Sequence, residues 1–296
     1  MKLSKKSLSR GLLLLLSTWA AGYFCNLQTD GFRIHEILSN MPNRERWETP
    51  HLSATERAKL LNQSFTYLGH GEQFYAFLGR DQKSVLKFFR HDYLSPRQLL
   101  RYLPLPASFK SALLSYKSRY DLSPLFDSAK LAFDELKEES GLITLHLNKS
   151  RSVYKTVTIY DKLGIAHSID LDSTEFLLQK KAEPFCVALD KKMQQHAIES
   201  AKKQIHSLMD SLKKQYQKGI LITDSSFKRN FGVIGDQALI MDVGSFIRQK
   251  QPMNREEQSI QIRKLTSRLE RWLKHHYPEL LETYGEDCLL KTSSNL

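Results

Sequence analysis

The sequence predicts an α+β protein with two lobes and a hydrophobic helix at its N-terminus. Strand patterns dominate between residues 64 and 180, helical patterns dominate from residue 190 onward, and residues 11–27 form an uncharged apolar run. The 296 residues are enough for one large domain or for two small lobes that share a cleft, and the 41% hydrophobic content is that of a folded protein. Extended disorder is therefore excluded.

The N-terminal run has the features of a bacterial export signal. Four basic residues and no acidic residue precede it. Its length is at the lower limit of roughly 17–25 residues that crosses a bilayer as a helix. The small residues 20–22 suit a cleaved signal peptide, whereas Trp19 and the aromatic pair at 23–24 suit a retained membrane anchor. Both remain open, and in both cases we expect an exported body that is membrane-anchored or secreted.

The next elements are a linker and three strands. Residues 28–62 join the apolar run to the body and contain a short helical pattern at 53–63. Residues 64–68, 73–78 and 84–89 alternate as strands and are separated by turn sequences at 69–71 and 79–82. Three antiparallel strands follow from this order.

A helical stretch over 95–140 comes next, and its last helix is the clearest. Ser123 is placed to cap it with Pro124 in its first turn, and Gly141 is placed to end it. Strand patterns then recur at 142–147, 153–160, 165–171 and 175–179, with a hairpin turn at 161–164.

The second half is mostly helical. Apolar stripes predict helices at 190–216 and 255–277. Between them, the block 219–246 contains two short apolar runs around Gly235-Asp236, which predict a short hairpin.

This order of elements, with the polar residues that accompany it, resembles the protein-kinase-like superfamily. The residues that carry the resemblance are Gly69 and Gly71 in a glycine turn, Lys87 in an apolar strand, Asp224 and Asn230 in a polar loop, and Asp242 in an Asp-Val-Gly sequence. Only about 50 residues follow Gly244, so small-molecule, sugar or lipid kinases are closer comparisons than true protein kinases.

The resemblance implies a role for each of these residues. Gly69, Gly71 and Lys87 would contact the phosphates of ATP. Asn230 and Asp242 would bind Mg²⁺ through oxygen atoms, and Asp224 would accept the proton of the acceptor hydroxyl. Asp242 follows Asn230 by twelve residues, a short hairpin's length, which would bring the two metal ligands side by side.

The resemblance also implies a glutamate that orients Lys87 and a hinge that binds adenine. Helical phase within 123–140 leaves both Glu135 and Glu139 as candidates for the glutamate. The strand at 175–179 is the expected hinge.

Several features depart from the superfamily pattern. Ile222-Thr223 stand where His-Arg precede the catalytic Asp, Asn230 follows Asp224 by six residues, and Phe74 stands at the third glycine. The Thr-Asp-Ser-Ser sequence around Asp224 also suits a plain turn. A pseudokinase that binds nucleotide or a protein partner without catalysis is therefore the alternative.

Charge and cysteine content limit the partners. Lys and Arg number 44 against 32 Asp and Glu, and the net charge of +12 favours phosphorylated small molecules, anionic lipid or nucleic acid. No nucleic-acid reader motif is present, so nucleic acid is not expected. The three cysteines make no disulfide framework and no zinc spacing, and we expect free thiols.

The predicted domains are an apolar signal or anchor (1–27), a linker with a short helix (28–62), a kinase-like N-lobe (63–182) and a reduced helical C-lobe (183–290). The predicted function is an ATP- and Mg²⁺-dependent phosphotransferase with an unknown acceptor that is anionic or membrane-associated. Residues 11–27 would contact the membrane if they are not cleaved.

Overall fold

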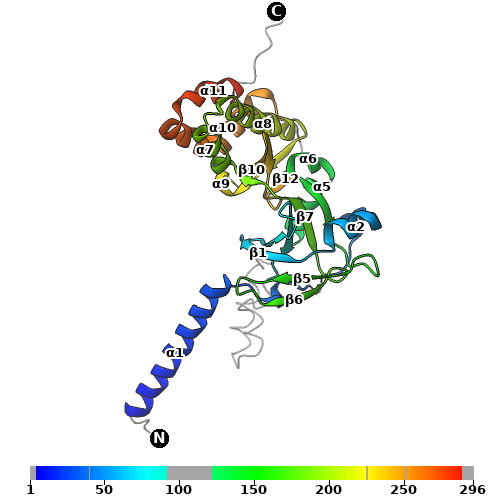
Figure 1. The fold of residues 1–296 in the computed structure, drawn as a ribbon, viewed down its shortest axis with the longest axis vertical. Helices are drawn as coiled ribbons and strands as arrows, with labels where there is room; N and C mark the ends of the chain where they lie inside the picture. The colour runs from blue at the N-terminus through cyan, green and yellow to red at the C-terminus, as the bar shows by residue number, and fades with distance from the viewer. Residues whose placement is uncertain are drawn as a thin grey trace, which may run out of the picture. The chain divides into compact units, whose positions relative to one another are not determined.

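The computed structural model describes residues 5–39, 41–91, 122–224, 226–249, 251 and 253–288. The chain divides into two compact units. The first comprises residues 1–43, 51–120 and 148–176, and the second comprises residues 44–50, 121–147 and 177–296. Both contain helices and strands, so the chain is a mixed α+β protein (Figure 1). The helical pattern over 95–121 lies outside the described residues.

The first unit contains the three antiparallel strands that the sequence predicts. They are β1 (Phe65–His70), β2 (Phe74–Gly79) and β3 (Ser84–Phe89). Phe65 faces Gly79 across the first pair, and Phe74 faces Phe89 across the second. Most aromatic side chains of these strands are buried, and the adjacent residues Phe88 and Phe89 are both buried, so β3 is covered on both faces.

Two further strands complete the ladder of the first unit. β5 (Thr156–Tyr160) runs parallel to β1 and antiparallel to β6 (Ala166–Asp170). The predicted hairpin around 161–164 is therefore confirmed. Asp161 closes it, because its Oδ1 accepts the N–H groups of Leu163 and Ile165 at 2.9 Å each.

The helices of the first unit are α1 (Lys5–Thr29), the short η1 (Ile34–Ile37) and α2 (Ala54–Leu61). A capping box of Ser53 and Glu56 starts α2 where the sequence predicts a helix. α1 exposes large apolar side chains between Leu13 and Leu27. Among the described residues, no helix is both long and apolar enough to cross a membrane.

The second unit begins with η2 (Glu45–Trp47), α5 (Ser123–Glu135), α6 (Lys137–Ser140), β4 (Leu142–His146) and most of β7 (Phe176–Lys180). β4 and β7 are neighbours. The single helix predicted over 123–140 is interrupted at Leu136, and its N-cap is Leu122 rather than Ser123. Gly141 ends α6 in the left-handed conformation with φ +64°, as glycine commonly does.

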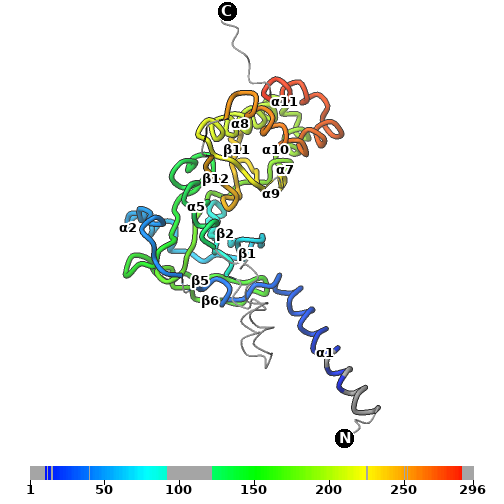
Figure 2. Tube along the Cα trace, turned by 180° about the vertical axis from the view of Figure 1, so that it is seen from behind, coloured from blue at the N-terminus to red at the C-terminus, as the bar shows by residue number. Residues whose placement is uncertain are grey.

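The helix predicted over 190–216 is two helices, α7 (Phe185–Gln194) and α8 (Ile198–Gln217). His196 separates them with φ +57°. α10 (Arg255–His276) matches the predicted tail helix, whereas η3 (Pro278–Leu280) and α11 (Leu281–Cys288) were not predicted. Figure 2 shows these helices grouped within their unit, and the apolar stripe of α8 is buried among them. All three cysteines are free thiols.

Short strands connect these helices. They are β8 (Glu183–Pro184), β9 (Ile220–Ile222), β10 (Phe231–Ile234), β11 (Gln237–Ile240) and β12 (Phe246–Arg248), with the one-turn α9 (Phe227–Asn230) before β10. They form a three-stranded sheet in the order β11-β10-β8 and a two-stranded sheet of β12 and β9.

Candidate functional site

Asp224 and Asn230 lie at the two ends of a short loop in the second unit. Asp224 follows β9, and Asn230 is the last residue of α9. Asn230 Nδ2 donates to Asp224 Oδ2 at 3.1 Å and to the Asp224 carbonyl oxygen at 3.2 Å. Asn230 is 1% exposed, so this amide is fixed in the interior. The structure therefore brings two of the predicted site residues into contact.

A tight hairpin brings Asp242 toward the same place. β10 and β11 pair antiparallel, and Phe231 faces Ile240. The Met241 N–H donates to the Asn230 carbonyl oxygen at 2.7 Å, so Met241 lies opposite Asn230. Asp242 is the next residue along the chain. Asp242 Oδ1 accepts the Gly244 N–H at 3.0 Å. The hairpin that the twelve-residue spacing predicts is thus confirmed, whereas a metal-binding role for its two ends stays a prediction.

The two ends of the segment 220–248 are also paired with each other, through β9 and β12. β9 leads to Asp224, β12 follows Asp242, and the two strands pair antiparallel with Phe246 facing Ile222. Thr223 donates to the Ser245 carbonyl oxygen twice, from its backbone N–H and from its Oγ1, at 2.9 Å each. The chain before Asp224 is therefore fixed against the chain after Asp242.

Ser128 of α5 is a positioning residue that the sequence reasoning missed. Its Oγ donates to the Val243 carbonyl oxygen and accepts the Phe246 N–H, each at 2.7 Å. The side chain is 2% exposed, so water does not replace these bonds. The signal was a small hydroxyl on the apolar face of the predicted helix 123–140, beside Leu125, Ala129 and Ala132.

The electrostatics of Asp224 favour an ionised carboxylate. Burial alone would raise the pKa of Asp224, but hydrogen bonds from Asn230 and Ser226 stabilise the charged form and hold the pKa below its usual value. Ser226 N–H reaches Asp224 Oδ1 at 2.9 Å. At neutral pH this group is therefore a hydrogen-bond acceptor with a negative charge.

The residues at this place fit a magnesium ion. Asn230 Oδ1 is buried and meets no hydrogen-bond partner within the described part of the chain, which costs about 1–3 kcal/mol unless a ligand satisfies it. An amide oxygen and carboxylates are the ligand types that Mg²⁺ prefers. The described residues contain no cluster of three or more His, Cys, Asp or Glu side chains able to hold a metal ion. Mg²⁺ sites commonly use only one or two carboxylates, with phosphates and water completing the shell.

The predicted phosphate-binding residues lie in the first unit on neighbouring strands. Gly69 sits at an irregularity of β1 with φ +155°, a conformation that favours glycine. The Gly71 N–H donates to the Phe74 carbonyl oxygen at 2.9 Å and closes the β1–β2 turn. Lys87 faces Ala76 across β2 and β3, and its Nζ lies 5.9 Å from the centre of the Phe74 ring. Phosphate contacts from these residues stay a prediction.

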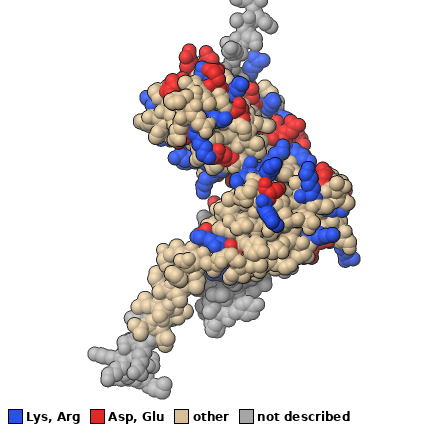
Figure 3. Space-filling model, viewed as in Figure 1, with Lys and Arg blue, Asp and Glu red and all other residues tan. Residues whose placement is uncertain are grey.

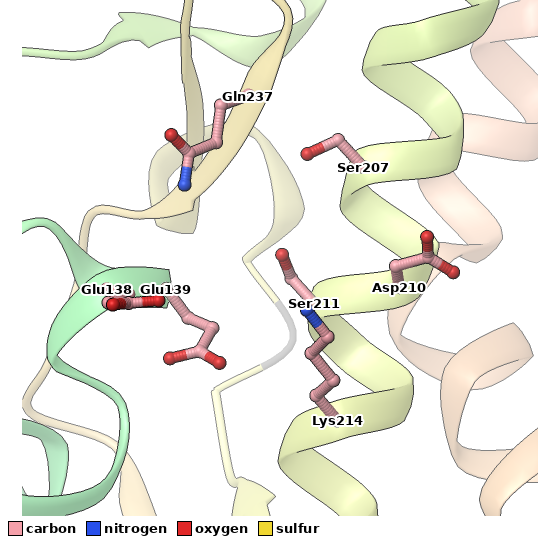
Figure 4. A pocket seen from close by; sticks show the side chains of 7 residues that line it. All are labelled: Glu138, Glu139, Ser207, Asp210, Ser211, Lys214 and Gln237. Atoms are coloured by element: carbon pink, nitrogen blue, oxygen red, sulfur yellow. The ribbon is translucent and has the colours of Figure 1, made fainter.

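The two candidate glutamates have cationic neighbours within the second unit. Glu135 Oε1 accepts from Arg248 Nη2 at 2.7 Å, and Glu139 Oε1 lies 3.8 Å from Lys218 Nζ. Glu139 also lines a polar pocket of about 340 Å³ between α6, α8 and β11 (Figure 4). The Glu139 side chain points into the space between α6 and α8. An ion pair of either glutamate with Lys87 stays a prediction.

Comparisons with known proteins give distant structural likenesses. No family model and no curated protein matches the sequence. A crystal structure of WbdD has 15% identity and a TM-score of 0.33 over 75% of this chain, and the match spans only 45% of that chain. Another WbdD structure, described as a bifunctional kinase-methyltransferase, has 16% identity, a TM-score of 0.30 and coverage of 73% and 42%. Rv3197 from Mycobacterium tuberculosis, in complex with erythromycin, has 14% identity, a TM-score of 0.32 and coverage of 96% and 75%.

Proposed function

We propose that the chain has a kinase-like fold and is a phosphotransferase that uses ATP and Mg²⁺ to phosphorylate an alcohol group. The observation that supports this proposal is the contact of Asn230 with Asp224, next to the backbone pairing that places Asp242 nearby, with the buried amide oxygen of Asn230 left without a partner among the described residues. The net charge of +12 favours an anionic acceptor, either a phosphorylated small molecule or a membrane lipid. We further propose that the body is exported, and membrane-anchored if residues 11–27 are retained.

Each residue has a distinct role in this proposal. Asn230 Oδ1 and the Asp242 carboxylate would hold Mg²⁺, which when bound neutralises charge on the phosphates. Asp224, ionised at neutral pH, would accept a hydrogen bond from the acceptor hydroxyl and orient its oxygen toward the γ-phosphorus. Lys87 on β3 would supply a fixed positive charge to the phosphates.

The change Asp224→Asn tests the enzymatic part of the proposal. The amide keeps the shape of the side chain but cannot accept the hydroxyl proton, so transfer or hydrolysis of the γ-phosphate should fall by roughly 10²–10⁴. ATP binding in the presence of Mg²⁺ should persist, which an equilibrium titration of the same sample measures. Turnover by the variant at the parent rate would refute the role of Asp224.

A specific observation favours a pseudokinase as the second candidate. Both carboxylate oxygens of Asp224 already accept hydrogen bonds from the protein, Oδ1 from Ser226 and Oδ2 from Asn230. Such a group is suited to holding a loop together and leaves fewer lone pairs for an acceptor. Binding of Mg·ATP by the parent protein without any hydrolysis or transfer would favour this candidate.

A further inference from the structure

A second pocket of the same unit lies beside α9 and has a volume of about 460 Å³. The residues that line it come from the β8–α7 segment, from α9 and from α10. They are Pro184, Cys186, Val187, Asp190, Lys228, Trp272 and His276. The volume is within the range of sites for small organic ligands, and the lining combines an aromatic surface with few charged groups, as such sites commonly do.

An aromatic cluster forms one wall of this pocket. The Trp272 ring lies 5.2 Å from the ring of His276 at an interplanar angle of 33°, and 5.4 Å from the ring of Tyr277 at 66°. These contacts fix the indole although Trp272 is partly exposed. A fixed and accessible aromatic face offers an apolar surface to the C–H face of a sugar ring while hydroxyl groups remain free to bond elsewhere.

Asp190 provides a positioned acceptor of hydrogen bonds. Its Oδ1 accepts from the Tyr277 hydroxyl, and its Oδ2 accepts from Gln194 Nε2 at 2.9 Å. Each carboxylate oxygen has two lone pairs, so acceptor capacity remains for the hydroxyl groups of a ligand. These two bonds also restrict the carboxylate to one orientation, which reduces the entropy lost when a ligand binds.

Lys228 supplies the positive charge of the pocket. Its side chain is exposed, and within the described residues no carboxylate forms a salt bridge with it. Burial raises the pKa of the Cys186 thiol to about 11, against the opposing influence of Lys228, so this thiol is protonated at neutral pH and is not a nucleophile. The pocket is therefore suited to reversible recognition of an anionic group.

The pocket is mechanically joined to the loop of Asp224 and Asn230. Phe227 of α9 is buried against Phe185 of α7 and Phe231 of β10, with ring centres 5.7 and 5.0 Å apart. This anchoring fixes the backbone from which Lys228 projects. Lys228 follows Asp224 by four residues, so their Cα atoms are at most roughly 14 Å apart.

We infer that this pocket binds a small acidic sugar, with the sugar ring on Trp272, hydroxyl groups at Asp190 and the acidic group at Lys228. That the sugar is the phosphate acceptor rests on the proposed function. In that reaction a sugar hydroxyl oxygen forms a bond to the γ-phosphorus of ATP, and the bond from this phosphorus to the ADP oxygen breaks with its electron pair on ADP. The hydroxyl proton passes to Asp224 and then to water.

Calorimetric titration of the full chain with D-glucuronate and with D-glucose, without nucleotide, tests the pocket. Glucuronate should bind at least tenfold more tightly than glucose. Lys228→Ala should remove this preference, and Trp272→Ala should weaken both sugars at least tenfold. Trp272→Phe, which keeps an aromatic face and the fold, should lose less affinity than Trp272→Ala. The control Lys274→Ala changes an exposed residue of α10 outside the pocket and should bind as the parent does.

Absence of glucuronate binding by the parent would overturn the inference, as would equal affinity in the parent, Lys228→Ala and Trp272→Ala. A separate Mg·ATP titration of the same preparation distinguishes the two proposals. Glucuronate binding without Mg·ATP binding would support the pocket and remove its role as an acceptor site. Mg·ATP binding without glucuronate binding would support the nucleotide site and overturn the sugar pocket.

Discussion

Only the nitrogen of the Asn230 side-chain amide has hydrogen-bond partners among the described residues. Its nitrogen donates to Asp224, whereas its buried oxygen has no hydrogen-bond partner among the described residues. A structural cap would normally use both groups, because leaving a buried acceptor unpaired destabilises the fold. The proposed metal site rests on this unpaired oxygen. In the proposed metal site, Asp224 and Asp242 would supply negative charge.

The change Ser128→Ala should loosen the segment that carries Asp242. It removes two buried hydrogen bonds, to the Val243 carbonyl oxygen and from the Phe246 N–H, and leaves both backbone groups unpaired. The free energy of unfolding should fall by about 1–3 kcal/mol in a denaturant titration. The control Ser259→Ala removes a hydroxyl that donates to the Arg255 carbonyl oxygen of its own helix, and it should change the free energy of unfolding by less than about 0.5 kcal/mol. Equal effects would show that Ser128 does not anchor this segment.

Acid titration should reveal the hydrogen bonds of Asp224. Its pKa in the folded state is lowered, so the ionised carboxylate stabilises the fold above its unfolded pKa of about 3.9, and this contribution is lost as the pH falls through the folded pKa. The difference in unfolding free energy between the parent and Asp224→Asn should therefore shrink below about pH 4. A difference that stays constant between pH 7 and pH 2.5 would contradict this account.

At the scale of elements, the β10–β11 hairpin positions the site. Gly232 of β10 permits the close approach of β8, because an added Cβ would lie 2.7 Å from the Glu183 carbonyl oxygen and 2.7 Å from Met241 Sδ. The first of these contacts is with a backbone atom, which cannot move away by a side-chain rotation. The glycine is thus required by packing between strands, and Met241 is the residue immediately before Asp242.

Gly232→Ala should therefore displace β8 from β10 and lower the free energy of unfolding by about 1–3 kcal/mol. Gly285→Ala is the matched control, since a Cβ at this position in α11 would meet nothing within 4 Å. An alanine in a helix should raise stability by about 0.5–1 kcal/mol. Thermal unfolding of both variants measures the contrast, and a Gly232→Ala variant as stable as the parent would refute the packing argument.

The elements that the sequence predicted well are those with a local signal. Alternation of apolar residues located β1–β3, and Gly235-Asp236 located the turn of the β10–β11 hairpin. The breaks at Leu136 and His196 lack such a signal, because neither residue is a glycine or proline. His196 is exposed and adopts a left-handed conformation just after α7, where its N–H donates to the Met193 carbonyl oxygen. Sequence spacing could place Asp242 beside Asn230, but the contact of Ser128 depends on α5, which is more than a hundred residues away.

At the scale of the whole molecule, the candidate residues fall in both compact units. Gly69, Gly71 and Lys87 belong to the first unit, whereas Asp224, Asn230 and Asp242 belong to the second. Of these six, the candidate residues of the second unit are joined by hydrogen bonds, Asn230 with Asp224 directly and Asp242 through the backbone pairing of its neighbour Met241. Both positive and negative side chains occur on the visible parts of each unit in Figure 3. A specific pocket is therefore a better guide to an anionic ligand than the overall charge.

We propose that Asn230 and Asp242 hold a metal ion that accompanies ATP. Thermal unfolding of the full chain with ATP, with and without Mg²⁺, tests it directly. At a hundred times the dissociation constant, the bound ligand should stabilise the parent by ~2.7 kcal/mol, with a clear increment from Mg²⁺. Asp242→Asn should abolish the Mg²⁺ increment. No Mg²⁺ increment in the parent, or an undiminished increment in Asp242→Asn, would contradict the claim.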